Sequence, residues 1–319
     1  MKIIHSISQL RQWVQDVRRG RTVAAVYDRR RLIFGPLPRD SARASGHRPP
    51  LQKSGEKVRL IVFVPTMGAL HAGHMSLIHR ARRTAGARGL VVVSIFVNPT
   101  QFNQKADLAR YPRRLAADTA MCRKAGVDML FAPSAAAMYP PDFSTWVEET
   151  TLSIPLCGKS RPGHFRGVCT VVLELFNLVQ PHVAIFGQKD IQQALVVRRM
   201  ARDLNIPVQI IIAPTVREKD GLAMSSRNQH LSLMERRRAV VLYASLGVAR
   251  SAFRKGVRSA KTIKQMARRH LFKTPGLRLD YLELVSCLTL RPVSRASSGD
   301  LLVVAAWVGG TRLIDNVRL

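Results

Sequence analysis

The feature that most constrains the fold is a regular alternation of apolar runs and helix-like stretches that begins at residue 60. Leu60–Val64 and Leu90–Val97 are short apolar runs, and each is followed by a loop and then by a stretch with helical character. Strands that alternate with helices in this way are typical of a parallel sheet with helices on both faces. The sequence therefore predicts an α/β fold with a doubly wound parallel sheet.

The alternation continues to about residue 215, after which the pattern changes. Apolar residues follow helical spacing over Val168–Val179 and stop before Pro181, where a helix must end. Ser232 and Glu235 have the spacing of a capping box, which predicts the start of a helix running toward Gly256. The remaining predicted elements are strands at 183–186, 208–212, 279–285 and 301–307 and helices at 191–204 and 260–272.

This change of pattern predicts two domains, a Rossmann-like domain over residues 1–215 and a smaller C-terminal α+β lid domain over 216–319. Residues 27–57 are rich in proline and basic residues, which indicates an insertion in the first domain, either a solvated loop or a basic arm for nucleic acid. Thr22–Val26 and Leu60–Val64, on either side of the insertion, are both candidate strands. Because Arg59–Val64 leads directly into Pro65, we expect it rather than Arg21–Val26 to form a central strand, and the insertion to lie away from the site.

Composition narrows the classes of partner and compartment. The chain has 51 Lys and Arg against 20 Asp and Glu, a net charge of +31, which favours anionic partners. Its 6% of aromatic residues is low for a single-stranded nucleic-acid platform. The apolar runs are far shorter than the roughly 18 residues of a membrane helix, and the four cysteines form no C-x-x-C pair. We therefore expect a cytoplasmic protein without structural zinc.

The segment Pro65–His74 stands out because it joins an apolar strand to a helix. Ligands of open α/β sheets collect beyond the carboxyl ends of the strands, and a helix N-terminus there favours phosphate. His71 and His74 flank Gly73, so both rings could face one phosphate chain. A nucleotide site and a chance pair of structural histidines are both open on this spacing, and metal binding is less favoured because no third ligand is near.

The H-x-G-H element resembles the signature of the nucleotidyltransferase superfamily, and the whole of Pro65–His74 resembles the pantothenate synthetase family. Other segments resemble the same family in the same order, and they cover nearly the whole chain apart from about residues 24–57. These segments are Val93–Phe102, Tyr111–Arg113, Ser160–Val168, Phe186–Gln193, Asp220–Asn228, Ala305–Trp307 and Leu313–Asn316.

The resemblance implies an ATP-dependent, Mg²⁺-requiring ligase that joins pantoate to β-alanine in two steps. The pantoate carboxylate would attack the α-phosphorus of ATP, giving pantoyl adenylate and pyrophosphate, and the β-alanine amine would then displace AMP. Such a reaction needs cations and hydrogen-bond donors on the triphosphate. The resemblance also implies a homodimer formed through the N-terminal domain.

The resemblance assigns roles to individual positions. His74 is the expected acid or charge stabiliser, and His71, Lys189 and Arg227 are the other catalytic candidates. Gln101, Gln193 and Asn98 are expected to hold pantoate or β-alanine, since amides bond hydroxyl and carboxylate groups without adding charge. The expected ATP-binding residues are Pro65, Thr66, Met67, Gly68, Ala69, Leu70, His71, Ala72, Gly73, His74, Gly187, Gln188, Lys189, Asp190, Val216, Met224, Ser225, Ser226 and Arg227.

Two other functions remain open from the sequence. One is a different H-x-G-H adenylyl- or cytidylyltransferase with another acceptor, which Gln101, Gln193 and the Ser160–Phe165 string argue against. The other is a basic nucleic-acid-binding protein on the same scaffold, with the insertion as its arm. We expect nucleic-acid binding at most as a side activity, recognisable by its dependence on salt.

Overall fold

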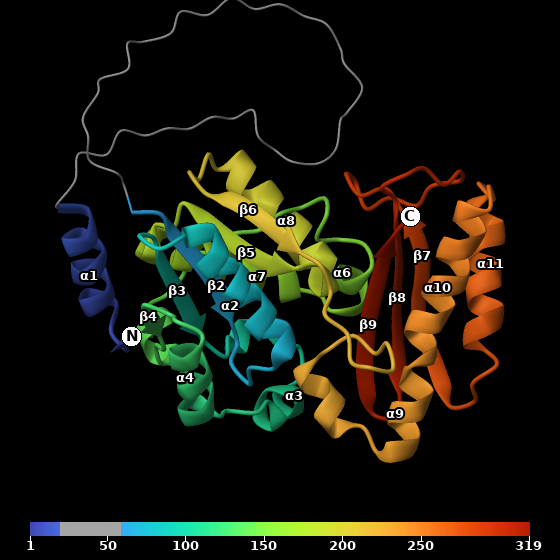
Figure 1. The fold of residues 1–319 in the computed structure, drawn as a ribbon, viewed down its shortest axis with the longest axis horizontal. Helices are drawn as coiled ribbons and strands as arrows, with labels where there is room; N and C mark the ends of the chain where they lie inside the picture. Colours follow the sequence, from blue (N-terminus) through green and yellow to red (C-terminus); the bar gives the residue numbers. More distant parts are fainter. Residues whose placement is uncertain (20–58) are drawn as a thin grey trace, which may run out of the picture.

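The computed structural model describes residues 1–19 and 59–319. Six strands form one sheet in the order β1-β4-β3-β2-β5-β6, and every neighbouring pair is parallel (Figure 1). The strands are β1 (Lys2–Ile4), β2 (Ile61–Thr66), β3 (Leu90–Ile95), β4 (Met129–Phe131), β5 (Val183–Gly187) and β6 (Gln209–Ala213). From β2 the chain winds through β3 to β4 on one side, then crosses to β5 and β6 on the other. A ligand crevice is therefore expected beyond the carboxyl ends of β2 and β5.

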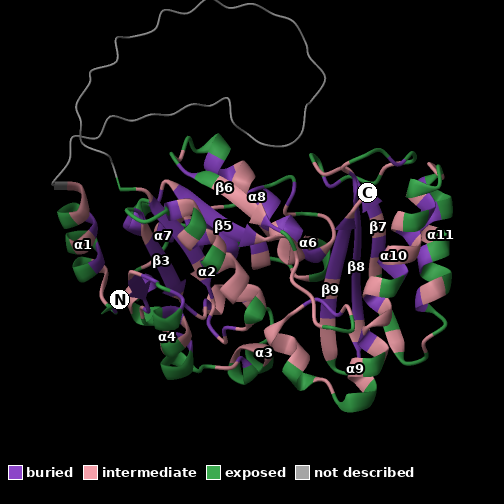
Figure 2. Cartoon of the chain, viewed as in Figure 1, coloured by how far each residue is buried: buried purple, intermediate pink, exposed green. Residues whose placement is uncertain are grey.

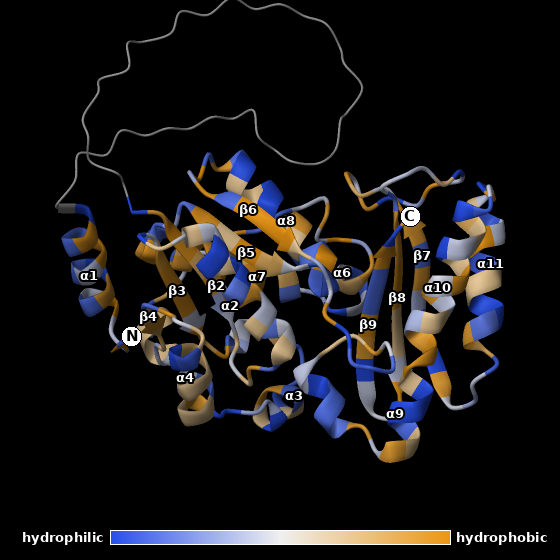
Figure 3. Ribbon diagram, in the orientation of Figure 1, coloured by the Kyte–Doolittle hydropathy of each residue, from blue (hydrophilic) through white to orange (hydrophobic). Residues whose placement is uncertain are grey.

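Helices cover both faces of this sheet, as the alternation predicted. Phe63 of β2 belongs to a core shared with α1, α7 and α8, whereas Val62 and Val64 belong to a second core shared with α2 and α4. Figure 2 shows β3 and β5 as mainly buried, and Figure 3 shows β3, β5 and β6 as mainly hydrophobic. The helices of this part are α1 (Ile7–Arg19), α2 (Ala72–Ala85), α3 (Lys105–Arg110), α4 (Leu115–Lys124), α5 (Ala135–Met138), α6 (Cys157–Ser160), α7 (His164–Val179) and α8 (Ile191–Asp203), with short 3₁₀ turns η1 (Pro99–Gln101) and η2 (Gln188–Asp190).

A separate core follows in the C-terminal part, built from residues 222–317. The antiparallel strands β7, β8 and β9 pair in that order, and α10 and α11 pack against the sheet (Figure 1). The elements are η3 (Ser226–His230), α9 (Leu233–Ala239), α10 (Val241–Arg254), α11 (Ala260–Leu271), β7 (Leu277–Val285), β8 (Leu301–Val308) and β9 (Thr311–Arg318). None of the described helices has the length and apolar character needed to cross a bilayer.

Several details test the sequence-based expectations. Of the two candidate segments for the central strand, the second does occupy the centre of the sheet, as β2. The capping box is present, with the Ser232 hydroxyl accepting from the Glu235 amide, but the single helix expected there is divided at Val240 into α9 and α10. The short β1 and β4 and the polar β9 were not predicted. The other candidate segment, at 21–26, and the insertion at 27–57 lie outside the described residues.

Candidate functional site

The loop after β2 is fixed by a buried carboxylate. Gly68 and Ala69 have φ of +79° and +50°, a left-handed backbone that side chains disfavour. Asp118 of α4 is 2% exposed and accepts hydrogen bonds from the amides of Ala69 and Leu70, both at 2.8 Å. A Cβ at Gly68 would lie 3.0 Å from the Ile95 side chain and 3.1 Å from an Asp118 oxygen. The loop therefore follows a path that glycine and Asp118 together permit.

The two histidines lie where this loop enters α2. His71 is the N-cap, and its Nδ1 accepts a hydrogen bond from the Gly73 amide at 3.1 Å. The rings of His71 and His74 are 4.1 Å apart between centroids. A Cβ at Gly73 would come within 2.8 Å of the His71 ring, so the two rings can approach each other in this way only around a glycine. The structure thus brings together the rings that the H-x-G-H spacing indicated.

Both histidines are neutral near pH 7. Burial, and next the neighbouring His71, lower the pKa of His74 to about 3. Burial and the Lys189 ammonium lower the pKa of His71. Because Nδ1 of His71 accepts a hydrogen bond, its proton is assigned to Nε2. Nδ1 of His74 is buried and has no hydrogen-bond partner among the described residues. The pair therefore offers N–H donors to a ligand rather than two extra cations.

The carboxyl end of β5 supplies a cation beside these rings. Gly187 ends the strand, and Lys189 in the following turn donates a hydrogen bond to Asp190 at 3.3 Å. Burial alone would raise the pKa of Asp190, but the Lys189 ammonium holds it below its usual value. Gln193, in the first turn of α8, lines the same cleft. This is the crevice that the strand order predicts.

A loop from the C-terminal part approaches the same place. The Met224 amide donates to the Val216 carbonyl at 3.0 Å, and the Met224 Cβ lies 3.5 Å from the position that a Cβ of Gly73 would take. The Ser225 hydroxyl caps the next turn by accepting from the Arg227 amide. Residues 216–227 therefore bring a second group of predicted site residues against the histidine loop.

The cleft between the two parts is lined by charged and polar side chains from both, and basic ones predominate. Arg227 donates to Asp107 of α3 at 3.1 Å, so this ion pair connects the C-terminal loop to the N-terminal part. The charged residues on the cleft wall include Asp107, Arg110, Lys159, Arg161, Lys189, Asp190, Arg227, Lys264, Asp280 and Arg312. A cleft with this charge suits a polyanionic ligand.

Gln101 lies at the end of β3, in the turn η1, and is 7% exposed. Its carbonyl accepts hydrogen bonds from Nη2 of Arg161 at 2.9 Å and from Nδ1 of His164 at 2.8 Å. Burial and the adjacent Arg161 lower the pKa of His164 to about 3, so this ring is neutral as well. Asn98 shapes the same turn, because its side chain accepts from the Thr100 amide and donates to the Gly167 carbonyl.

The predicted site residues thus come from four segments. These are the loop after β2, the turn after β5, the turn η1 that follows β3, and the loop at 216–227 of the C-terminal part. Sequence reasoning assigned no role to Asp118, Arg161, His164 or Asp107. Asp118 and His164 bond to main-chain atoms, and such partners cannot be recognised from the types of the residues involved. Arg161 and His164 do lie within a string that resembles the family. The described residues contain no cluster of three His, Cys, Asp or Glu side chains that could hold a metal ion.

Comparisons with known proteins agree on one family. The model of the pantoate-beta-alanine ligase family matches residues 42–318. A pantothenate synthetase of Thermotoga neapolitana is 56% identical over 264 residues, which cover 83% of this chain and 93% of the relative. The crystal structure of a pantothenate synthetase from Thermus thermophilus superposes with a TM-score of 0.81 at 41% identity over 99% of both chains. A ligase from Francisella tularensis, solved in complex with beta-gamma ATP and beta-alanine, gives a TM-score of 0.71 at 30% identity over 100% of this chain and 97% of that one.

Proposed function

We propose that this chain, which belongs to the pantoate-beta-alanine ligase family, activates pantoate as an adenylate and then transfers the pantoyl group to β-alanine. In the first step a pantoate carboxylate oxygen bonds to the α-phosphorus of ATP and pyrophosphate leaves. In the second step the β-alanine amine attacks the pantoyl carbonyl carbon, AMP leaves, and the amine loses a proton. The products are pantothenate, AMP and pyrophosphate.

The observation that carries the proposal is the meeting of three groups at the carboxyl ends of β2 and β5. The adjacent rings of His71 and His74, the Lys189 ammonium and the Arg227 loop approach one another there. Negative charge builds on the phosphates as the bond to pyrophosphate breaks, and fixed donors around that charge lower the barrier. The Francisella tularensis relative was solved with beta-gamma ATP and β-alanine, which supports the same classes of ligand here.

The remaining ATP contacts come from backbone as well as side chains. In the proposal the loop from Pro65 to His74 and the turn from Gly187 to Asp190 hold the nucleotide. Val216 lies by the adenine, and Met224, Ser225, Ser226 and Arg227 close over the triphosphate. His74 donates to the phosphates as a neutral imidazole, since its pKa of about 3 leaves it uncharged. Closure of the C-terminal lid domain keeps water from the adenylate.

Pantoate is assigned to the part of the cleft that is lined by Gln193 and by Arg161 and His164, which both bond to the Gln101 carbonyl. A primary amide offers both donors and an acceptor, so two glutamines can hold a carboxylate and hydroxyls without an added charge. The buried Asn98 supports this subsite by shaping the turn that carries Gln101. β-Alanine enters beside pantoate in this proposal, because its amine must reach the activated carbonyl.

Magnesium fits this donor set as an ion carried by the nucleotide. Mg²⁺ is commonly held by substrate phosphates, water and one or two carboxylates. Asp107 and Asp190 are single carboxylates on the cleft wall, and they are the residues that would hold it. When bound, Mg²⁺ neutralises charge on the triphosphate. We further propose a cytoplasmic homodimer that pairs through the N-terminal domain, on the strength of the family resemblance.

The test is product release by the purified protein in the presence of Mg-ATP, pantoate and β-alanine, with each substrate omitted in turn. We expect AMP and pyrophosphate only when pantoate is present, and continued turnover only when β-alanine is added. A folded protein that binds ATP but releases neither product with pantoate would contradict the proposal. Turnover with a different acid would instead support another H-x-G-H transferase.

A further inference from the structure

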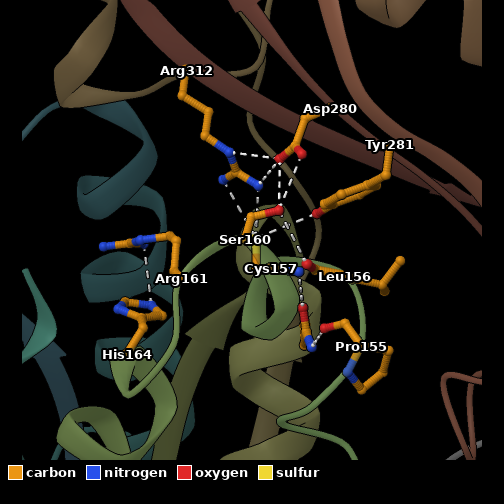
Figure 4. A network of polar contacts seen from close by, with 10 residues as sticks. Pro155, Leu156, Cys157, Ser160, Arg161, His164, Asp280, Tyr281 and Arg312 are labelled. Carbon is orange, nitrogen blue, oxygen red and sulfur yellow. Dashed lines mark hydrogen bonds and ion pairs between the residues drawn. The ribbon is translucent and has the colours of Figure 1, made fainter. Parts of the chain in front are cut away.

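The short helix α6 (Cys157–Ser160) is held by side chains of the C-terminal sheet (Figure 4). Arg312 of β9 donates to Asp280 of β7 from Nε at 3.0 Å and from Nη2 at 2.7 Å. Both terminal nitrogens of Arg312 also lie 3.5 Å from the Cys157 sulfur. Ser160 donates to Asp280 at 2.9 Å, and the Tyr281 hydroxyl is 3.3 Å from the Cys157 sulfur. Arg312 therefore contacts Cys157 at the start of α6, and its partner Asp280 binds Ser160 at the end of the helix.

This contact is well placed to be rigid. The side chains of Arg312 and Asp280 are 14% and 23% exposed, so water screens their ion pair less than it would screen a surface pair. A guanidinium group can donate hydrogen bonds to a carboxylate and to the sulfur at the same time because its donors are arranged in a planar fork. A lysine ammonium lacks this arrangement.

Beyond α6 the chain leads directly to the groups that hold Gln101. Arg161 follows Ser160, and its Nη1 lies 3.3 Å from Nε2 of His164 (Figure 4). Arg161 and His164 both donate to the Gln101 carbonyl. A shift of α6 would therefore move both donors and the turn that carries Gln101.

The other side of α6 is held by a buried glutamine of α8. Gln192, adjacent to Gln193, is 6% exposed and accepts from the Cys157 amide at 3.0 Å. The same side chain donates to the carbonyls of Leu152 and Pro155, at 2.9 and 2.7 Å. The helix α6 is thus held by Gln192 of α8 on one side and by Arg312 and Asp280 of the C-terminal sheet on another.

We propose that Arg312 is a positioning residue that sets the pantoate side of the cleft through α6. It acts on Gln101 through Cys157, Ser160, Arg161 and His164, and the C-terminal sheet thereby fixes the acid subsite as well as closing the cleft. The inference rests on the proposed function, in which Gln101 holds pantoate. It assigns Arg312 an indirect effect on pantoate and little effect on the nucleotide.

The test compares Arg312→Met with Arg258→Met in steady-state kinetics and thermal unfolding. Arg258 also belongs to the C-terminal part, where it lies over the Phe253 ring at 4.2 Å, but it contacts neither α6 nor the cleft wall, so it is the matched control. Misplacement by a fraction of an ångström is costly in a preorganised site, so we expect Arg312→Met to raise KM for pantoate roughly tenfold. KM for ATP should stay within about twofold, and the control should change neither.

Two further variants separate positioning from general damage. Ser160→Ala removes one bond to Asp280 and leaves Arg312 in place, so it should raise KM for pantoate in the same direction by a smaller factor. In a Gln101→Ala background, Arg312→Met should add little to KM for pantoate, because both changes act through one group. Equal changes in KM for pantoate and ATP, or full additivity with Gln101→Ala, would overturn the inference. Failure of the wild-type protein to turn over pantoate would instead refute the proposed function.

Discussion

The histidines of the H-x-G-H sequence act as neutral groups because each is packed against the other and withdrawn from water. A charged His74 would have to be desolvated beside His71 and Lys189, and its pKa falls accordingly. What the protein gains is a donor whose direction is fixed. Gly73 permits the close approach of the two rings, and the hydrogen bond by which His71 caps α2 orients the His71 ring. Preorganisation of this kind, rather than added charge, is what these two residues supply.

Substituting His74 should therefore affect the adenylation step. Loss of a fixed donor beside the phosphates should slow pantoate-dependent pyrophosphate release by roughly 10²-fold in His74→Ala. Binding of ATP, measured by calorimetry, should change much less. An unchanged rate of pyrophosphate release would remove His74 from the chemistry.

The lowered histidine pKa values also predict how stability depends on pH. His74 and His164, each with a pKa of about 3 in the folded state and about 6.5 when unfolded, bind more protons in the unfolded chain between those values. The free energy of unfolding should thus fall as pH drops below about 6.5, by up to about 1.4 kcal/mol per pH unit for each histidine.

The variant that checks this is His164→Asn, whose side-chain amide can still donate to the Gln101 carbonyl. Urea unfolding at several pH values between about 4 and 7 should show a shallower loss of stability than in the wild type. Equal slopes in the two proteins would show that His164 is not buried as a neutral ring.

Asp118 is a residue whose importance only the structure reveals. Both of its carboxylate oxygens accept from loop amides, so Asp118→Asn places an NH₂ group against an N–H donor. We expect destabilisation of about 1–3 kcal/mol and a raised KM for ATP. Thermal unfolding together with steady-state kinetics measures both quantities. A variant with wild-type stability and KM would show that the loop keeps its conformation without this carboxylate.

At the scale of elements, the periodicity of apolar residues in the sequence was enough to predict the parallel sheet and most of its helices. Strands buried on both faces, such as β2 and β5, leave a continuous apolar run, and α7 ends at Val179 before Pro181 as expected. The strands β1 and β4 have only three residues each, too few for a periodic signal. No glycine or proline lies at the division between α9 and α10, so the sequence carries no local signal for this break.

Two glycines in helices show how packing decides what an element tolerates. A Cβ at Gly167 of α7 would lie 2.5 Å from the Thr100 carbonyl oxygen, whereas at Gly247 of α10 it would meet nothing within 4 Å. We therefore expect Gly167→Ala to destabilise the protein by about 3 kcal/mol and to disturb the turn carrying Gln101. Gly247→Ala should stabilise it by roughly 0.5–1 kcal/mol, because alanine is the better helix former.

Urea unfolding of both variants measures the difference, and KM for pantoate reports on the turn. If the two substitutions had effects of the same sign on stability, the close approach of α7 to η1 would not be a real constraint. The sequence offers no means of telling these glycines apart, since both lie inside helical patterns. Only the neighbour across the helix interface distinguishes them.

At the scale of the whole molecule, the site is assembled from segments that lie far apart in the chain. The family resemblance, rather than residue spacing, was what assigned these segments to one site. The histidine loop was identified from its own residues, whereas the turn after β5 and the loop at 216–227 were identified through the resemblance. The first two meet because the strand order places β2 beside β5. The bonds that hold them, such as Arg227 to Asp107, depend on tertiary contacts that no local pattern encodes.

The net charge of +31 acts at this largest scale, and it predicts a selective effect of salt. ATP carries several negative charges, pantoate carries one, and β-alanine is a zwitterion, so the positive field of the cleft favours them in that order. Raising ionic strength from about 50 to about 300 mM shortens the screening length, and KM for ATP should rise about threefold or more. KM for β-alanine should change little over that range. Initial rates at saturating concentrations of the other substrates provide the measurement, and a parallel rise for all three substrates would show that salt acts on the fold rather than on the field of the cleft.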